Sequence, residues 1–250
     1  MLKSLTAFSE NKRGRYPFII KFCYNACMPR QARNVFANIP HHVTQRGNRQ
    51  EDVFFSDVDK DYYLKLLKQY SQDHEVEVLA YCLMTNHIHL ILKPSTEKGL
   101  QEVLKPLHMR YSQYINKKKN WSGHLWQGRY FSSALDEQYT YYAFRYVENN
   151  PVQAKMVSKA TDYQYSSARH HCGLLTNKLI SKYDIGVSKQ EYEAYLEQTT
   201  DQTSVDILRR NVNKGLPCGS NEFVAELGKK LGRDLFFKQI GRPKKGTVPF

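Results

Sequence analysis

The chain has 250 residues, 41% of them hydrophobic, and carries 37 Lys and Arg against 24 Asp and Glu, a formal net charge of +13. Its apolar runs stay short of the roughly 20 residues that a membrane-spanning helix needs, so we expect no association with a membrane. The five cysteines are odd in number and scattered, which supports neither a disulfide framework nor a zinc knuckle and favours a reducing cytoplasm. The excess of positive charge favours a polyanionic partner.

The spacing of apolar residues predicts an alternation of strands and helices over the first two thirds of the chain. Acidic first turns mark the beginnings of two helices, and the Thr85-Asn86 connection predicts a hairpin between two strands. The elements expected in chain order are strand 38–45, helix 57–74, strand 75–84, strand 87–94, helix 99–119 with Pro106 as a kink or late start, strand 129–135 and helix 136–150.

This order is that of the split βαβ arrangement of ferredoxin-like folds, with one more helix at the end. We therefore predict an α+β fold whose first and third strands lie side by side at the centre of an antiparallel sheet. One face of that sheet is expected to be covered by helices and the other to be available for a ligand. The expected organisation is a basic N-terminal tail (1–27), read as a tail and not a signal peptide, a folded domain (28–172) and a basic C-terminal region of short helices (173–250).

The stretch TNHIHLIL places His87 and His89 one residue apart in the predicted strand 87–94. Because side chains alternate across a strand, both imidazoles project from one face, about 7 Å apart, and can converge on a divalent cation. An isolated pair of this kind is more often two ordinary hydrogen-bonded histidines. The helix 136–150 offers partners, since Tyr146 and Asn150 lie one turn apart and the amide oxygen of Asn150 can supply a third ligand.

Residues 101–133 carry six Lys or Arg against one acid and mix them with aromatic residues. Cations that meet phosphates beside rings that stack on bases are typical of proteins that bind single strands, although a solubilising surface is the plain alternative. Trp126 has an alternative as a buried structural corner, and Arg46 has one as a surface residue. The candidate DNA-binding residues are Arg46, Arg110, Lys117, Lys118, Trp126 and Arg129.

The C-terminal stretch GRPKK (241–245) resembles the core of an AT-hook, a segment that lays an extended arginine into a narrow minor groove. It adds Arg242 to the candidate DNA-binding residues. A solvated tail is the alternative.

The motifs NHIHL, GHLWQGRYFSS and RYVENNPVQA, in this order, resemble the single-tyrosine HUH transposases, and among them most closely the REP-associated tyrosine transposases of bacteria. The resemblance covers roughly residues 30–170. It implies that Tyr146 is the nucleophile and that His87, His89 and Asn150 hold the metal, Mg²⁺ or Mn²⁺; imidazole ligands suit Mn²⁺ better. It also implies single-stranded or hairpin DNA as the substrate, a monomer that completes its site in cis, and a place in the bacterial cytoplasm, on the nucleoid when bound to DNA.

The function that the resemblance implies is that of a DNA endonuclease and strand transferase that works through a 5′-phosphotyrosine, in transposition or on REP-type repeats. Free tyrosine has a pKa of about 10, so the nucleophile needs a neighbour that helps it ionise, and the sequence does not identify one. Two alternatives stay open. A nucleic-acid-binding module on the same sheet would not need the histidines and the tyrosine. A phosphodiesterase that uses water would predict more carboxylates around the histidines.

Overall fold

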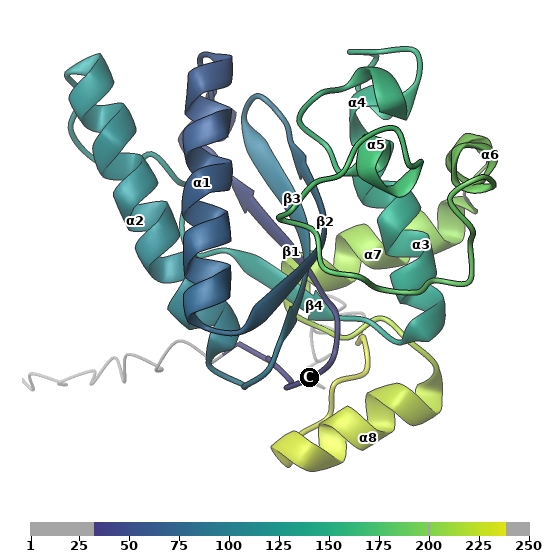
Figure 1. Ribbon diagram of the computed structural model, residues 1–250. Coiled ribbons are helices and arrows are strands. Elements are labelled where there is room, and N and C mark those ends of the chain that lie inside the picture. The colour runs from purple at the N-terminus through teal and green to yellow at the C-terminus, as the bar shows by residue number, and fades with distance from the viewer. Residues whose placement is uncertain (1–32, 200, 239–250) are drawn as a thin grey trace, which may run out of the picture. The chain divides into compact units, whose positions relative to one another are not determined.

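The computed structural model describes residues 33–199 and 201–238, which belong to one compact unit. Its centre is a four-stranded antiparallel sheet in the order β2-β3-β1-β4 (Figure 1). The two central strands are therefore the first and the third, as the split βαβ pattern predicts. The strands are β1 His41–Arg46, β2 Val76–Leu83, β3 His87–Pro94 and β4 Phe131–Ala134.

Helices cover both faces of the sheet. Two long helices, α1 (Asp57–Asp73) and α2 (Gly99–Lys119), pack together on one face, and α3 (Glu137–Glu148) and α7 (Gln202–Lys214) lie on the other (Figure 1). We expected the second face of the sheet to be available for a ligand. That expectation is wrong, because α3 and α7 bury much of this face. The remaining elements are α4 Asn150–Gln153, α5 Ala168–His171, α6 Tyr192–Glu197, α8 Asn221–Leu231, and the 3-10 turns η1 Asn48–Gln50 and η2 Ala160–Asp162.

The apolar face of the sheet shows why these residues form strands. Val43 pairs with Leu90 across β1 and β3, and both are fully buried. In β-strands the neighbouring positions must then point the other way, toward α3 and α7. The predicted hairpin is present: the Met84 N–H donates to the His87 carbonyl (2.9 Å) and closes the Thr85-Asn86 connection. Pro106 lies inside α2, which begins seven residues earlier as predicted and not at the proline.

The C-terminal helices are joined to the sheet by backbone and side-chain hydrogen bonds. The Cys218 N–H donates to the Ala134 carbonyl (2.8 Å), next to the end of β4. Asp136 caps α3 by accepting from the Tyr139 N–H and also accepts from the Ser220 N–H, both at 2.8 Å. The first turn of α3 is thereby fixed to the start of α8. The domain boundaries expected near residues 27 and 172 stay predictions.

In the described part of the chain, no helix is long and apolar enough to cross a bilayer. The three cysteines in that part, Cys82, Cys172 and Cys218, are free thiols.

Candidate active site

His87 and His89 lie on one face of β3, as strand alternation predicts. The register places them opposite Arg46 and Thr44 of β1, on the side of the sheet that α3 covers. Their ring centroids are 5.0 Å apart. His89 is 6% exposed, whereas His87, the first residue of β3, is only half-buried. The pair therefore has a buried member and a member that is open to solvent.

A third histidine, His42 of β1, stacks on His89. The His42 Nε2 and the His89 Nδ1 are 3.0 Å apart, and the two ring centroids are 5.3 Å apart. His42 was not among the candidate site residues expected from the sequence. The sequence could have indicated it, because His42 belongs to the strand expected over 38–45. That strand was expected beside the strand that carries His89.

Burial keeps these imidazoles neutral. It lowers the pKa of His42 to about 3. The pKa of His87 is lowered to about 4, first by burial and then by the nearby positive charge of Arg46. The pKa of His89 lies well below the ordinary value, because of burial and the neighbouring histidines and arginines. A neutral ring keeps one nitrogen lone pair, which is the form that binds metals.

The tautomer of His87 is set by its neighbour Asn86. The His87 Nδ1 lies 2.6 Å from the Asn86 Oδ1, which accepts only, so the proton of the neutral ring sits on Nδ1. The Nε2 lone pair is then left for a ligand. A ring held this way from behind is the usual arrangement around a metal-binding histidine.

Tyr146 lies on α3 directly against two of the histidines. Its ring is edge-on to the rings of His42 and His89, with both centroids 5.6 Å away, and the residue is 5% exposed. Its Oη accepts a hydrogen bond from the Arg209 Nε at 3.4 Å. Arg209 comes from α7, and no pattern in the sequence pointed to it.

Asn150 does not continue the helix that carries Tyr146. The expected helix 136–150 ends at Glu148, and Asn150 opens the short α4. Its side-chain amide donates to the Tyr146 carbonyl at 2.7 Å, which holds the two residues together across the break. This bond uses the amide nitrogen, so the Oδ1 is the atom that remains for a ligand.

The ligands expected from the sequence are two imidazoles and one amide oxygen, and among the described residues no hydrogen bond joins Asn150 to His87 or His89. Within residues 33–199 and 201–238, no group of three or more His, Cys, Asp or Glu is arranged to hold a metal ion. Neutral imidazoles together with an oxygen donor nevertheless fit a divalent ion that accepts mixed ligands and keeps positions open for substrate.

The candidate DNA-binding residues divide into two groups. The first group consists of four exposed residues: Arg46, Arg110, Lys117 and Arg129. Arg46 of β1 is paired with His87 on the neighbouring strand β3. Lys118 is also exposed, but its Nζ lies 2.6 Å from the Oδ1 of the buried Asp59. Arg242 lies outside the described residues.

Trp126 is not available to DNA. It is 7% exposed and packs against the rings of Tyr63, His108 and Tyr111. Its indole N–H donates to the His108 carbonyl at 3.3 Å. The structure thus shows the alternative that the sequence left open, a structural corner with Trp126 in the core.

The fold is an antiparallel sheet with the strand order of a ferredoxin-like fold, and the phenol of Tyr146 lies against the imidazoles of His42 and His89 on one face of it. Residues 35–150 match the family described as "Transposase IS200 like". No curated protein matches the chain significantly.

Two solved structures are similar to the chain. One is a REP-associated tyrosine transposase bound to a REP hairpin, with 15% identity and a TM-score of 0.48 over 64% of this chain and 94% of that one. The other is a transposase from Deinococcus radiodurans R1, with 18% identity and a TM-score of 0.35 over 48% of this chain and 96% of that one.

Proposed function

We propose that this protein cleaves and rejoins DNA strands with Tyr146 as its nucleophile. The observation that carries the proposal is the position of the Tyr146 phenol, which lies against the rings of His42 and His89 and accepts a hydrogen bond from Arg209. A tyrosine kept only for packing has no need of a cation hydrogen-bonded to its hydroxyl.

The reaction is a phosphoryl transfer between two hydroxyl groups. The Tyr146 Oη attacks phosphorus, an Oη–P bond forms, and the bond from phosphorus to the 3′ oxygen breaks. The phenol proton passes to solvent and the departing 3′ oxygen takes one up, which leaves a 5′-phosphotyrosine and a 3′-hydroxyl. Because the covalent link preserves a phosphodiester, another 3′-hydroxyl can attack it and release Tyr146 without an added energy source.

His87, His89 and Asn150 are the residues that would hold a divalent metal, Mg²⁺ or Mn²⁺. When bound, the metal supplies Lewis acidity to the phosphate oxygens and helps to orient the scissile bond. The neutral state of the two imidazoles and the remaining Oδ1 of Asn150 support this assignment.

The substrate we propose is single-stranded DNA, folded into a hairpin beside the cleaved bond. Tyr146 is almost fully buried between α3 and the sheet, so the phosphate has to approach on a flexible strand. The exposed Arg46, Arg110, Lys117 and Arg129 are the groups we assign to the DNA backbone. Tyr146 contacts His42 and His89 of its own chain, which supports a site completed in cis by a monomer.

A denaturing-gel assay tests the nucleophile. Labelled hairpin oligonucleotides from the protein's own genomic neighbourhood are incubated with Mn²⁺ and the wild type, Tyr146→Phe or Tyr142→Phe. Tyr142 is the matched control, because it lies one turn earlier on α3 and its hydroxyl contacts Gln138 instead of the histidines. We expect a metal-dependent covalent protein–DNA band with the wild type and Tyr142→Phe, and none with Tyr146→Phe.

Two results contradict the proposal. A band that persists in Tyr146→Phe assigns the nucleophile elsewhere. Tight binding without any covalent product, over a broad set of hairpins, shows the non-cleaving binding module instead.

A further inference from the structure

Arg209 reaches the candidate active site from outside the segment that matches the transposase family. It lies on α7, which follows that segment by more than fifty residues. The helix has a firm start, because the Asp201 carboxylate accepts from the Ser204 N–H at 2.9 Å. It is anchored by Val205, Leu208 and Val212, all nearly or fully buried. The backbone that carries Arg209 is thus held against α3 and β4.

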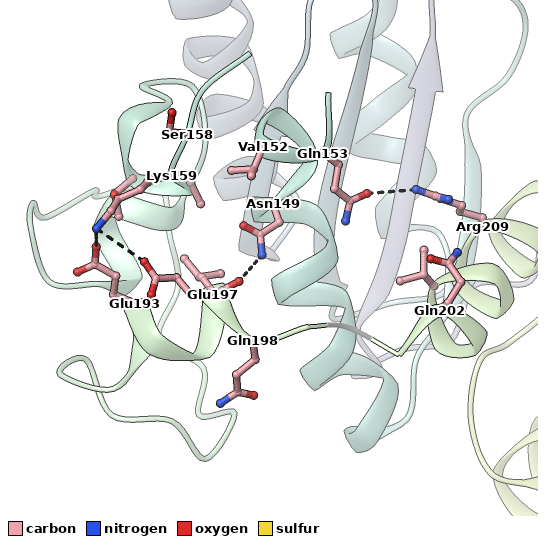
Figure 2. A pocket seen from close by; sticks show the side chains of 14 residues that line it. Asn149, Val152, Gln153, Ser158, Lys159, Glu193, Glu197, Gln198, Gln202 and Arg209 are labelled. Carbon is pink, nitrogen blue, oxygen red and sulfur yellow. Dashed lines mark hydrogen bonds and ion pairs between the residues drawn. The ribbon is translucent and has the colours of Figure 1, made fainter. Parts of the chain in front are cut away.

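The guanidinium of Arg209 makes two contacts with the nucleophile's surroundings. Its Nε donates to the Tyr146 Oη at 3.4 Å, and an Nη2 hydrogen goes to the Gln153 Oε1 at 3.1 Å (Figure 2). The central carbon lies 5.5 Å from the centroid of the Tyr146 ring. Arg209 also lines a pocket of about 390 Å³, together with Asn149 and Gln153. One cation therefore faces both the phenol and an open cavity beside it.

The charge of Arg209 is not neutralised by a carboxylate. Among the described residues, no Asp or Glu forms an ion pair with it. The next residue behaves differently: the Arg210 Nε donates to Asn211, and its guanidinium lies over the ring of Phe237.

We propose that Arg209 is a catalytic residue of the strand-cleavage site and that the C-terminal region thereby completes the active centre in cis. As Tyr146 loses its proton and attacks, its oxygen gains negative charge, and a guanidinium already in hydrogen-bond contact stabilises that charge. The other N–H groups of Arg209 remain available for an oxygen of the attacked phosphate. The proposal rests on the proposed function, and it identifies the cationic neighbour that a tyrosine nucleophile requires.

A structural role is the competing explanation, because the bond from Arg209 to Gln153 also connects α7 to α4. Four variants of the full-length protein separate the two roles. Arg209→Gln removes the charge, and Arg209→Lys keeps it. Gln153→Ala removes the connection to α4 but leaves the charge, and Arg210→Gln makes the same charge change one residue away.

The measurement is the single-turnover rate of covalent adduct formation on a hairpin that the wild type cleaves, over a series of DNA concentrations. Loss of one preorganised charge-stabilising donor typically slows the chemical step by about 10²–10³-fold, so we expect a loss of at least about 10²-fold for Arg209→Gln at saturating DNA. The half-saturating DNA concentration should change by less than about threefold, because the interaction acts mainly in the transition state. We expect Arg209→Lys to recover part of the rate, and Gln153→Ala and Arg210→Gln to keep it.

Added guanidinium ion should also restore part of the rate to Arg209→Ala, and none to Tyr146→Phe. Circular dichroism and thermal unfolding establish that each variant is folded. A wild-type rate for Arg209→Gln overturns the proposal, and so does an equal loss in Gln153→Ala, which would make Arg209 a structural connector. A loss confined to DNA affinity would make it a phosphate contact only. If the wild type itself forms no adduct on any hairpin, the proposed function fails and the role of Arg209 fails with it.

Discussion

His42 and His89 share one proton, and its position decides what His89 can bind. If the His89 Nδ1–H donates to the His42 Nε2, the His89 Nε2 has a free lone pair for a metal. His42 then carries its own proton on Nδ1, an atom that is buried and has no hydrogen-bond partner among residues 33–199 and 201–238. In the opposite arrangement the His89 Nε2 is protonated and cannot be a ligand. A bound metal therefore selects the first arrangement, and His42 orients the ligand from behind.

Replacing His42 should weaken metal binding even though it is not a ligand in this arrangement. For His42→Phe, which keeps the ring packing, we expect Mn²⁺ affinity to fall by about 10–100-fold, the usual effect of losing such an orienting partner. Calorimetric titration of Mn²⁺ into the DNA-free protein measures it, with the exposed His124→Phe as control. Equal affinities for wild type and His42→Phe would show that the position of the shared proton does not matter.

Between elements, the contact of α1 with α2 depends on a buried carboxylate. Asp59 of α1 has a fully buried side chain, and it accepts from the Lys118 Nζ, the Tyr114 hydroxyl and the Phe55 N–H. Burial raises the pKa of Asp59, but these three donors outweigh it, and the pKa ends below the usual value. The basic run 117–119 therefore contains one lysine with a structural role.

Neighbouring lysines of that run should give opposite results. Lys118→Ala leaves Asp59 with fewer donors, so we expect the free energy of unfolding at pH 7 to fall by about 1–2 kcal/mol. Lys117→Ala should change it by less than about 0.5 kcal/mol and should weaken DNA binding in a salt-dependent way. Urea unfolding and DNA titrations at two salt concentrations measure both effects. Equal destabilisation by the two substitutions would contradict the structural role of Lys118.

The elements could be predicted because each depends on local pattern. The alternation that places His87 and His89 on one face, and the order of strands that makes β1 and β3 central, both follow from periodicity and were confirmed. The packing of α7 could not be predicted, since it depends on contacts far apart in the sequence, and Arg209 went unnoticed with it. Composition did not decide between the two roles of Trp126, and it did not indicate the ion pair of Lys118 with Asp59, because both depend on tertiary contacts.

Over the whole molecule, buried neutral histidines link stability to pH. The His41 Nε2 accepts from the Phe36 N–H at 3.2 Å and its Nδ1 lies 2.7 Å from the Ile39 carbonyl, so the neutral ring has both nitrogens paired. Burial lowers the pKa of His41 to about 4, against an opposing effect of the bond to Ile39. In the core, burial lowers the pKa of His108 to about 3, with a smaller effect from Arg33.

The protein should therefore lose stability in mild acid. The folded-state pKa values lie below the unfolded value of about 6.5. As the pH falls, the unfolded chain therefore binds more protons than the folded chain. The stability present above about pH 6.5 is lost as the pH falls toward about 4. Each such histidine contributes a slope of about 1 kcal/mol per pH unit in that window. Urea unfolding between pH 7 and 5 measures the slope, which should become flatter in His41→Gln and stay unchanged in His124→Gln. A free energy of unfolding that does not change with pH would contradict the predicted loss of stability in mild acid.

The placement of α7 also bears on how such proteins can be recombined. Tyr146 and Arg209 are separated by 63 positions, and only the first lies within the segment shared with the transposase family. A chimera that joined this segment to an unrelated C-terminal region would inherit a tyrosine without the guanidinium that touches it here. The smallest piece that keeps this contact therefore extends through α7, and two proteins that align well over the matched segment can differ in the charge beside the Tyr146 hydroxyl.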